Sequence, residues 1–309
     1  MIIATSSTVY ALLSTHTQPD ALHTDLSIRR AIEGQETSII ALTDGSLLLR
    51  SNNELQQVST TIPDRIDALC LLRERPLHLL IGTTPPHVYR LRGDNMIRLC
   101  PSFEALSVRS QWYTPWGGPP AVRSLAATTD GWVYADIHVG SIMCSSDQGH
   151  TWEPVTPTLH NDVHEVATTP ARDNNVYANT YLSVYVSDDR GKTWHHRSDA
   201  LHNRYGRGVA INPKDPSIML CGVSDGPTGI NVHGQLYYSE NAGSTWHHIT
   251  QGFPSSTRQN IDTFHITYMD ENTAWVADED NLYLSHDCGQ TWELYWTAPE
   301  EILTLSCHH

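Results

Sequence analysis

The sequence predicts an all-β fold, namely a single β-propeller of seven four-stranded blades, with six blades as the alternative. Three observations support this prediction. A short polar motif occurs four times at intervals of 42, 52 and 46 residues, and propeller blades repeat over about 40–50 residues. Short runs rich in β-branched and aromatic residues flank every copy. Dividing the 309 residues among seven blades gives about 44 residues for each blade.

The recurring motif has the pattern S-x-[DN]-x-G-x-T-W. Its acid or amide position falls at Asp147, Asp189, Asn241 and Asp287. Asp and Asn side chains hydrogen-bond the backbone further along a turn, and the glycine allows a positive φ without steric cost. A strand-like run precedes each copy, so the motif predicts the turn of a β-hairpin held by side-chain hydrogen bonds. We expect the motif's Trp side chains to pack against the neighbouring sheet; they are Trp152, Trp194, Trp246 and Trp292.

These octapeptides resemble the Asp-box, or BNR, repeats of sialidases, sortilin-type receptors and bacterial BNR propellers of unassigned activity. The resemblance covers about half of the chain and implies the propeller fold, with the box turns lying away from any ligand site. Fold alone says little about activity. Sialidases use an arginine triad, for which Arg65, Arg123 and Arg207 would stand here. Their Arg-Ile-Pro signature is missing, however, and the nearest stretch reads "DRIDAL".

The blades can be assigned in chain order. The closing blade combines residues 300–309 with residues 1–32, so that "EILTLSC" forms its inner strand and "IIATSSTVYALL" supplies the partners. Residues 33–61 and 62–101 form two blades without a box. Four boxed blades follow, at residues 118–158, 160–200, 202–252 and 258–299. Closure by both ends of the chain leaves no open sheet edge.

Composition limits the environment and the partners. The formal net charge of −15 disfavours nucleic acid and anionic membranes as partners. The six scattered cysteines include no C-x-x-C pair, so free thiols in a reducing cytosol fit better than a disulfide scaffold. The first residues lack the basic region and apolar core of a signal peptide. No apolar run approaches the length of a membrane span. These features predict a soluble cytoplasmic protein.

Charged residues are predicted to ring the central channel. In propellers, the start of each inner strand and the loop after the second strand open on one face. Aligning the inner strands puts charged side chains at five matching positions, which are Asp67, Arg123, His164, Arg207 and Asp262; Ser38 and Leu303 fill the other two. A charge in a confined channel is costly unless it is paired or binds a ligand. The ring is therefore either an internal girdle of ion pairs or a polar pocket.

Nearby residues extend this candidate site. The expected catalytic residues are His164, Asp262, Glu165 and Tyr181. The expected substrate-binding residues are Arg123, Arg207, Asp67, His138, Asn179, His233, Trp112 and Trp116. The two Trp residues belong to the stretch "SQWYTPWGGPP", which acts either as an aromatic lid at the mouth or as a hydrophobic plug between blades. No cofactor is expected, although His138, His164 and His233 are the candidate ligands for a divalent metal.

Two classes of function fit these residues. The first is an enzyme of the hydrolase or lyase type, glycoside-hydrolase-like in one version, acting on a small anionic or polar substrate by general acid/base chemistry. The alternative is a non-catalytic propeller that binds a protein or acts as an assembly factor. The two classes differ in whether the charged side chains of the ring pair with one another, because unpaired charges in a wet pocket favour an enzyme. Mutually satisfied charges favour a binding or structural role.

Overall fold

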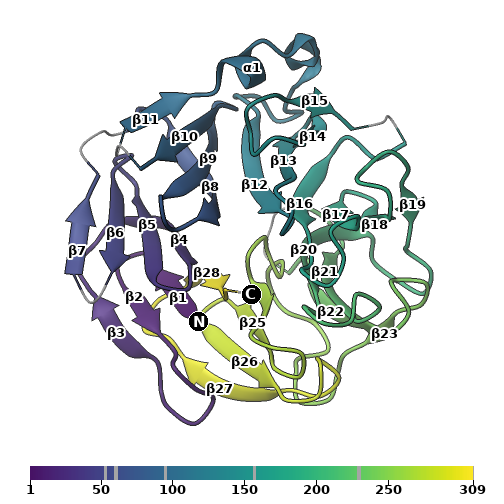
Figure 1. Cartoon of the computed structure of the whole chain (residues 1–309). Helices are drawn as coiled ribbons and strands as arrows, with labels where there is room; N and C mark the ends of the chain where they lie inside the picture. Colours follow the sequence, from purple (N-terminus) through teal and green to yellow (C-terminus); the bar gives the residue numbers. More distant parts are fainter. Residues whose placement is uncertain (52–53, 59–61, 94–95, 156–157, 228–230, 309) are drawn as a thin grey trace.

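The computed structural model describes residues 1–51, 54–58, 62–93, 96–155, 158–227 and 231–308. Seven antiparallel sheets, each of four strands, are arranged in a ring around a central axis (Figure 1). The predicted propeller of seven blades is therefore confirmed, and the alternative of six blades is wrong. In every sheet one strand lies innermost and the next strands follow it outward. The described part of the chain contains no helix that is long and apolar enough to cross a membrane.

Strands from both ends of the chain close the ring. Strand β28 (Ile302–Ser306) is the inner strand of this blade and pairs with β1 (Ile2–Thr5) in antiparallel register. Strands β2 (Val9–Ala11) and β3 (Asp20–His23) complete the sheet. The predicted closure by N- and C-terminal strands is confirmed. It leaves the ring without an open seam at this blade.

The two blades without a box keep the same four-stranded plan. The first contains β4 (Ile28–Glu33), β5 (Thr37–Leu42), β6 (Leu47–Ser51) and β7 (Glu54–Gln57). The second contains β8 (Arg65–Arg73), β9 (His78–Thr84), β10 (Val88–Arg92) and β11 (Met96–Leu99). A short helix α1 (Pro101–Glu104) and a 3₁₀ turn at Ser107–Gln111 then lead to the boxed blades.

The four boxed blades follow in chain order. The first two contain β12 (Ala121–Ala127), β13 (Val133–His138), β14 (Ser141–Ser145), β15 (Glu153–Pro154), and β16 (Val163–Ala167), β17 (Val176–Thr180), β18 (Ser183–Ser187), β19 (His195–His196). The last two contain β20 (Tyr205–Ile211), β21 (Met219–Ser224), β22 (Gln235–Ser239), β23 (His247–His248), and β24 (Ile266–Tyr268), β25 (Ala274–Asp278), β26 (Asn281–Ser285), β27 (Glu293–Thr297). Each box lies between the third and fourth strands of its blade.

The box turn is held by its own side chains, as the spacing predicts. Ser187 Oγ accepts a hydrogen bond from the backbone N–H of Gly191 at 2.8 Å and lies 2.9 Å from Asp189 Oδ1. The Asp189 carboxylate accepts hydrogen bonds from both the backbone N–H and the hydroxyl of Thr193, at 2.8 and 2.7 Å. The indole of Trp194 is buried and donates to the carbonyl of Gly191. These bonds fix the hairpin, and its residues are not among those that line the pocket at the channel mouth.

The hydrophobic core consists of seven clusters, and each cluster joins two neighbouring blades. In one of them Leu80 of β9, Ile137 of β13 and Trp152 of the first box are all buried together. None of the six cysteines, all in the described part of the chain, forms a disulfide. Packing between sheets, and not covalent links, therefore holds the blades in place and fixes the inner strands around the channel.

One inner strand differs from the sequence-based alignment. The inner strand of the first blade is β4, whereas Ser38 lies on the second strand, β5. Arg29 and Arg30 therefore occupy the channel position that was expected for Ser38. Residues 28–32 were expected in the closing blade, but β4 begins the next blade, and its Ile28 and Ala31 are buried. Asp262 also lies in the loop before β24 and not within a strand.

Candidate functional site

The first ends of the inner strands enclose a pocket of about 330 Å³ at one mouth of the channel. Its charged lining residues come from several blades and are Arg29, Arg30, Arg65, Asp67, Arg123, Arg207, Asp262 and Glu301. His138, His265 and Leu303 also line it. The structure thus brings four of the predicted ring residues, Asp67, Arg123, Arg207 and Asp262, into one pocket. It adds a cluster of arginines around them.

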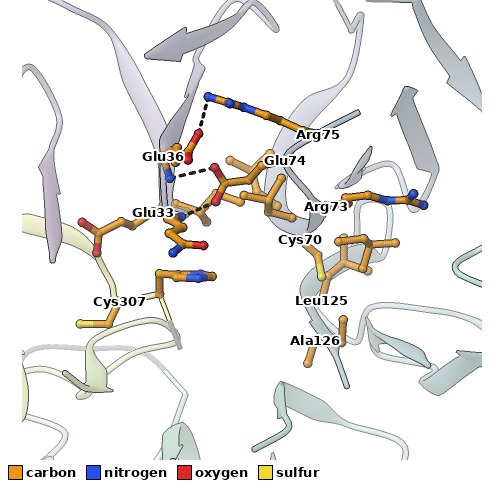
Figure 2. Close-up of a pocket in the computed structure, with 16 residues that line it drawn as sticks. Glu33, Glu36, Cys70, Arg73, Glu74, Arg75, Leu125, Ala126 and Cys307 are labelled. Carbon is orange, nitrogen blue, oxygen red and sulfur yellow. Dashed lines mark hydrogen bonds and ion pairs between the residues drawn. The ribbon is translucent and has the colours of Figure 1, made fainter. Parts of the chain in front are cut away.

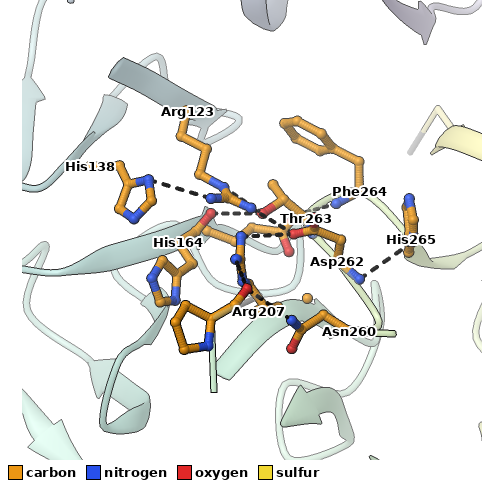
Figure 3. Close-up of polar contacts among 12 residues, drawn as sticks. Arg123, His138, His164, Arg207, Asn260, Asp262, Thr263, Phe264 and His265 are labelled. Carbon is orange, nitrogen blue, oxygen red and sulfur yellow. Dashed lines mark hydrogen bonds and ion pairs between the residues drawn. The ribbon is translucent and has the colours of Figure 1, made fainter. Parts of the chain in front are cut away.

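Asp262 is the centre of the first group of charges (Figure 3). Arg123 donates a hydrogen bond of 2.6 Å to its Oδ1, and Arg207 donates another of 3.3 Å to the same oxygen. Thr263 N–H adds a third donor at 2.7 Å. Burial would raise the pKa of Asp262, but the two guanidinium charges outweigh that effect and hold the pKa well below its usual range. The two guanidinium charges therefore favour the ionised form of this carboxylate at neutral pH.

Asp67 is the centre of the second group. Arg29 and Arg65 form ion pairs with its carboxylate, and the hydroxyl of Thr84 donates a further hydrogen bond. Burial would raise the pKa of Asp67, but the hydrogen bonds from Arg29 and Thr84 outweigh burial and lower it. The two aspartates of the predicted ring are thus both ionised and both held by arginines.

Arg30 differs from the other arginines of the pocket. Its guanidinium donates only to backbone carbonyls, those of Asp67 and Arg29, and lies 5.3 Å from the centre of the Phe264 ring. Among the residues that the structure describes, no carboxylate forms an ion pair with it. Burial, followed by the charge of Arg29, lowers the pKa of Arg30 to about 10. The charges of Asp67 and Asp262 attract it, but neither forms an ion pair with it in the described part of the chain.

His164 lies behind this pocket, in contact with a second histidine and an aspartate. Its side chain is fully buried, and its Nδ1 lies 2.5 Å from the carbonyl oxygen of Gly206. Its Nε2 lies 3.1 Å from the Tyr205 hydroxyl and 3.3 Å from Asp162 Oδ1. Burial, together with nearby arginines, lowers the pKa of His164 to about 4. It is neutral at neutral pH and is shielded from the pocket.

His138 connects this cluster with the pocket. It is the last residue of β13, and its Nε2 lies 3.2 Å from Asp162 Oδ1. Its other nitrogen, Nδ1, lies 3.4 Å from a guanidinium nitrogen of Arg123 (Figure 3). Burial lowers the pKa of His138 below its ordinary value. Sequence reasoning did not single out Asp162, because the alignment of the inner strands pointed to His164, two residues further along.

Two predicted site residues, Glu165 and Asn179, form hydrogen bonds to neighbouring blades. The Glu165 carboxylate accepts hydrogen bonds from the backbone N–H groups of Val209 and Phe264, which belong to the next two blades. Burial raises the pKa of Glu165 to about 8. Asn179 donates from its amide to the carbonyls of Gly208 and Gly222. The structure thus places both side chains in contacts that hold the blades together.

The aromatic insert divides into two parts. Trp112 packs against Phe103 with ring centres 5.7 Å apart and acts as a plug between blades. Trp116 is 60% exposed, and its ring centre lies 5.0 Å from that of His138. Tyr181 is also half exposed and lies against Tyr205. The insert therefore serves as a plug at one Trp and presents the other at the mouth of the pocket.

His233 lies outside this cluster of contacts. Its Nδ1 is 2.6 Å from Asp225 Oδ2, and both side chains are more than half exposed. The described contacts of His233 do not include His138 or His164. The metal ligands expected from the sequence are thus not brought together as a set of three histidines, and Asp162 stands where the third was expected.

A larger pocket, of about 570 Å³, lies at the other ends of β4, β8 and β12 (Figure 2). Its Glu74 carboxylate accepts hydrogen bonds from the backbone N–H groups of Gln35 and Glu36. Arg75 forms an ion pair with Glu36. Burial raises the pKa of the Cys70 thiol to about 12, so this sulfur is not a thiolate nucleophile. The paired charges and the inert thiol make this pocket the weaker candidate.

Comparisons with known proteins agree with the fold. The Sortilin-Vps10 family model (sortilin, neurotensin receptor 3) matches residues 140–274, which is less than half of the chain. No curated protein sequence matches the chain. Together with the propeller structures described next, the family match supports a BNR-type propeller.

Three solved structures illustrate the likeness. An ancestral GH74 enzyme has a TM-score of 0.65 and 15% identity over 87% of this chain and 38% of that chain. YCF48 bound to D1 peptide has a TM-score of 0.60 and 14% identity over 95% and 84%. The WD40 propeller domain of Doa1 has a TM-score of 0.63 and 12% identity over 92% and 87%. This chain spans well under half of the GH74 enzyme, and identities this low establish the shared propeller fold alone.

Proposed function

We propose that the protein is a binding propeller whose channel pocket holds an anionic group, of the carboxylate class, on a small molecule or a peptide. The observation that carries this proposal is the charge of the pocket. Five arginines and three carboxylates line it, in a chain whose formal net charge is −15. Its two histidines have lowered pKa values and add no charge at neutral pH. The pocket therefore has an excess of positive charge in an otherwise acidic molecule.

Arg30 gives this excess a specific place. Guanidinium groups bind carboxylates through paired hydrogen bonds, and Arg30 is the pocket arginine that makes no ion pair with a carboxylate among the described residues. Keeping a buried cation without a counter-ion costs free energy. An anionic ligand would offset that cost. The low-dielectric walls of the channel would strengthen the attraction.

The state of the acidic residues favours binding over glycoside hydrolysis. Glycosidases commonly need one carboxyl with a raised pKa as the general acid and a second carboxylate. Both Asp67 and Asp262 have lowered pKa values because arginines hold them. Glu165 has a raised pKa, but its oxygens accept backbone hydrogen bonds between blades. The neighbours in fold include both an enzyme and a peptide-bound protein, and the charges described here favour the second kind of role.

A screen of small ligands tests the proposal. Thermal shift would be measured with mono-, di- and tricarboxylates, short acidic peptides and the uncharged amide of each compound. Calorimetry would then compare the hits on Arg30→Gln and on Arg75→Gln, a matched control at the other mouth of the channel. Loss of one charged hydrogen-bonding partner predicts about 10- to 100-fold weaker binding for Arg30→Gln. The control should bind normally. Equal binding of the amides, or no effect of Arg30→Gln, would refute the proposal.

Catalysis by general acid/base chemistry is the second candidate, and one observation favours it. His138 lines the same pocket, and Asp162 lies beside its Nε2, so the carboxylate can orient the ring. A ligand found in the screen would be incubated with the protein and followed by mass spectrometry. Turnover that is lost in His138→Gln while ligand affinity is kept would establish an enzyme. Unchanged ligand after prolonged incubation would leave the binding role.

A further inference from the structure

We propose that His138, Asp162 and His164 form a site for one divalent transition-metal ion of the zinc class. The site lies in the wall of the anion pocket, between two neighbouring blades. His138 is the last residue of β13, whereas Asp162 immediately precedes β16 and His164 lies on it. The inference goes beyond the proposed function, because binding of an anion by arginines does not require a metal.

The spacing of the three ligand atoms supports a metal site. Asp162 Oδ1 lies 3.2 Å from His138 Nε2 and 3.3 Å from His164 Nε2, and the three atoms all lie within 4.8 Å of one another. Zinc binds imidazole nitrogen and carboxylate oxygen at about 2.0–2.2 Å in a tetrahedron, which separates neighbouring ligand atoms by roughly 3.3 Å. The two measured nitrogen–oxygen distances agree with that separation.

The hydrogen bond of His164 orients its ring for metal binding. A backbone carbonyl only accepts hydrogen bonds, so the Nδ1 that lies 2.5 Å from the Gly206 oxygen carries the ring hydrogen. The lone pair of the neutral ring is then at Nε2, where it accepts the Tyr205 hydroxyl hydrogen at 3.1 Å and also lies 3.3 Å from Asp162 Oδ1. Two electron-rich atoms at this distance repel unless a cation or a proton lies between them. A metal ion at Nε2 would take the place of the hydrogen bond from Tyr205. A bond from the other ring nitrogen to a carbonyl is the usual support for a metal-binding histidine.

Unpartnered atoms provide a second, independent observation. His138 Nε2 and Asp162 Oδ1 are both buried, and neither makes an aligned hydrogen bond within the described part of the molecule. Buried polar atoms without a partner are rare, because each one loses its hydration without compensation. Among the described contacts, the Tyr205 hydroxyl bonds His164, at 3.1 Å, and neither of these two atoms. A metal ion among the three residues would satisfy both unpartnered atoms.

The donor set indicates the kind of metal and an open position. Two imidazoles and one carboxylate suit Zn²⁺ and related ions better than Mg²⁺ or Ca²⁺, which prefer oxygen ligands. Three protein ligands leave the fourth position of a tetrahedron for water or for a ligand atom. His138 also lines the pocket, so the fourth position lies near the arginines. With metal at Nε2, the ring hydrogen of His138 would be at Nδ1, so the 3.4 Å contact with Arg123 would be given up, while Arg123 keeps its bond to Asp262.

Metal titration of the full chain, without a histidine tag and after treatment with a chelator, tests this site. Cobalt binding would be followed by visible absorption, and zinc binding by calorimetry and by competition with cobalt. We expect one ion per chain at the specific site. Asp162→Asn and His138→Gln should each weaken binding by more than about 100-fold, since even second-shell changes cost up to that factor. The matched control is His233→Gln, because His233 is an exposed histidine paired with an aspartate; it should bind normally.

Crystals soaked in zinc would locate the ion by anomalous scattering. An ion bound by the three residues would support the proposal. An ion only at surface histidines, no binding, or an equal loss in His233→Gln would overturn it. Circular dichroism shows whether each variant is folded. If Asp162→Asn is unfolded, metal binding by His138→Gln tests the site instead. Arg30→Gln should keep the cobalt spectrum while it loses anion binding, so failure of the metal site and failure of the proposed function are distinguishable.

Discussion

His78 is a buried histidine whose two ring nitrogens have no hydrogen-bond partner in the described structure. It begins β9 and is 2% exposed. Burial, together with the charges of Arg92, Arg90 and Arg73, lowers its pKa to about 4. The native state therefore holds this ring neutral, whereas the ring of the unfolded chain binds a proton below about pH 6.5. Stability from this group is present above pH 6.5 and is lost as the pH falls toward 4.

Replacing His78 by leucine should remove this dependence on pH. Urea unfolding would give the free energy of unfolding of both proteins at pH 7 and at pH 4.5. We expect the drop between these two pH values to be about 1–2 kcal/mol smaller in His78→Leu than in the wild type. The difference between the two proteins isolates His78 from the other titrating groups. His195→Leu is the matched control, because His195 is exposed on an outer strand. An identical pH dependence for His78→Leu and the wild type would contradict this explanation.

At this scale the sequence located only some of the pocket. The repeat period predicted positions at the starts of inner strands, and Asp67, Arg123, Arg207 and Asp262 do line one pocket. Arg29 and Arg30 were missed, because residues 1–32 were assigned to the closing blade, whereas their strand β4 is the inner strand of the next blade. A repeat period gives the level of a residue along the channel. It does not give the direction of the side chain. For this reason the sequence could not show that His164 lies behind the pocket and not in it.

Among the structural elements, the box hairpin offers a built-in comparison. Three boxes carry an aspartate, and the third box along the chain carries Asn241. The Asn241 side chain keeps both bonds of the turn. Its Oδ1 accepts the N–H of Thr245 at 2.8 Å, and its amide donates to the Thr245 hydroxyl at 2.8 Å. The carboxylate charge is thus not required for these two hydrogen bonds.

Substitutions at Asp189 should separate these two contributions. Asp189→Ala removes both hydrogen bonds to Thr193, and we expect a loss of about 1–2 kcal/mol in the free energy of unfolding. Asp189→Asn should cost less than about 0.5 kcal/mol, because an amide serves the same turn at Asn241. Chemical denaturation of the two variants side by side measures the difference. Equal losses would mean that charge, and not hydrogen bonding, holds the turn.

The elements differ in how well the sequence predicts them. The boxed blades carry repeated turn chemistry, which marks the hairpin between their third and fourth strands. The blades without a box have only apolar runs to mark their strands. In the first of them the sequence-based alignment assigned the inner position to β5, whereas the inner strand is β4. A period-2 pattern interrupted by two adjacent arginines does not reveal which side of a strand is buried. Contacts across blades decide that, and these contacts join residues far apart in the sequence.

For the whole molecule, the ring joins all seven blades through the seven clusters between neighbouring sheets. The cluster at the closure combines Ile3 and Tyr10 with Trp275, Ile302 and Leu305. It thus draws on both ends of the chain. A propeller whose closing strand is lost has an open edge and two exposed apolar surfaces. Closure should therefore stabilise every blade and not only its own.

Removal of β28 tests this coupling. A chain that ends at Glu301 lacks the strand that pairs with β1, together with the buried side chains of Ile302 and Leu305. Deleting one buried aliphatic side chain typically costs about 2–5 kcal/mol, so the loss of two with their backbone ladder should lower Tm by more than about 10 °C. A chain that ends at Ser306 keeps β28 and is the control.

Hydrogen exchange should show faster exchange in blades on the far side of the ring, since the open ring loses cooperativity. Loss of protection confined to β1–β3 would instead mean that the blades are stable independently of closure.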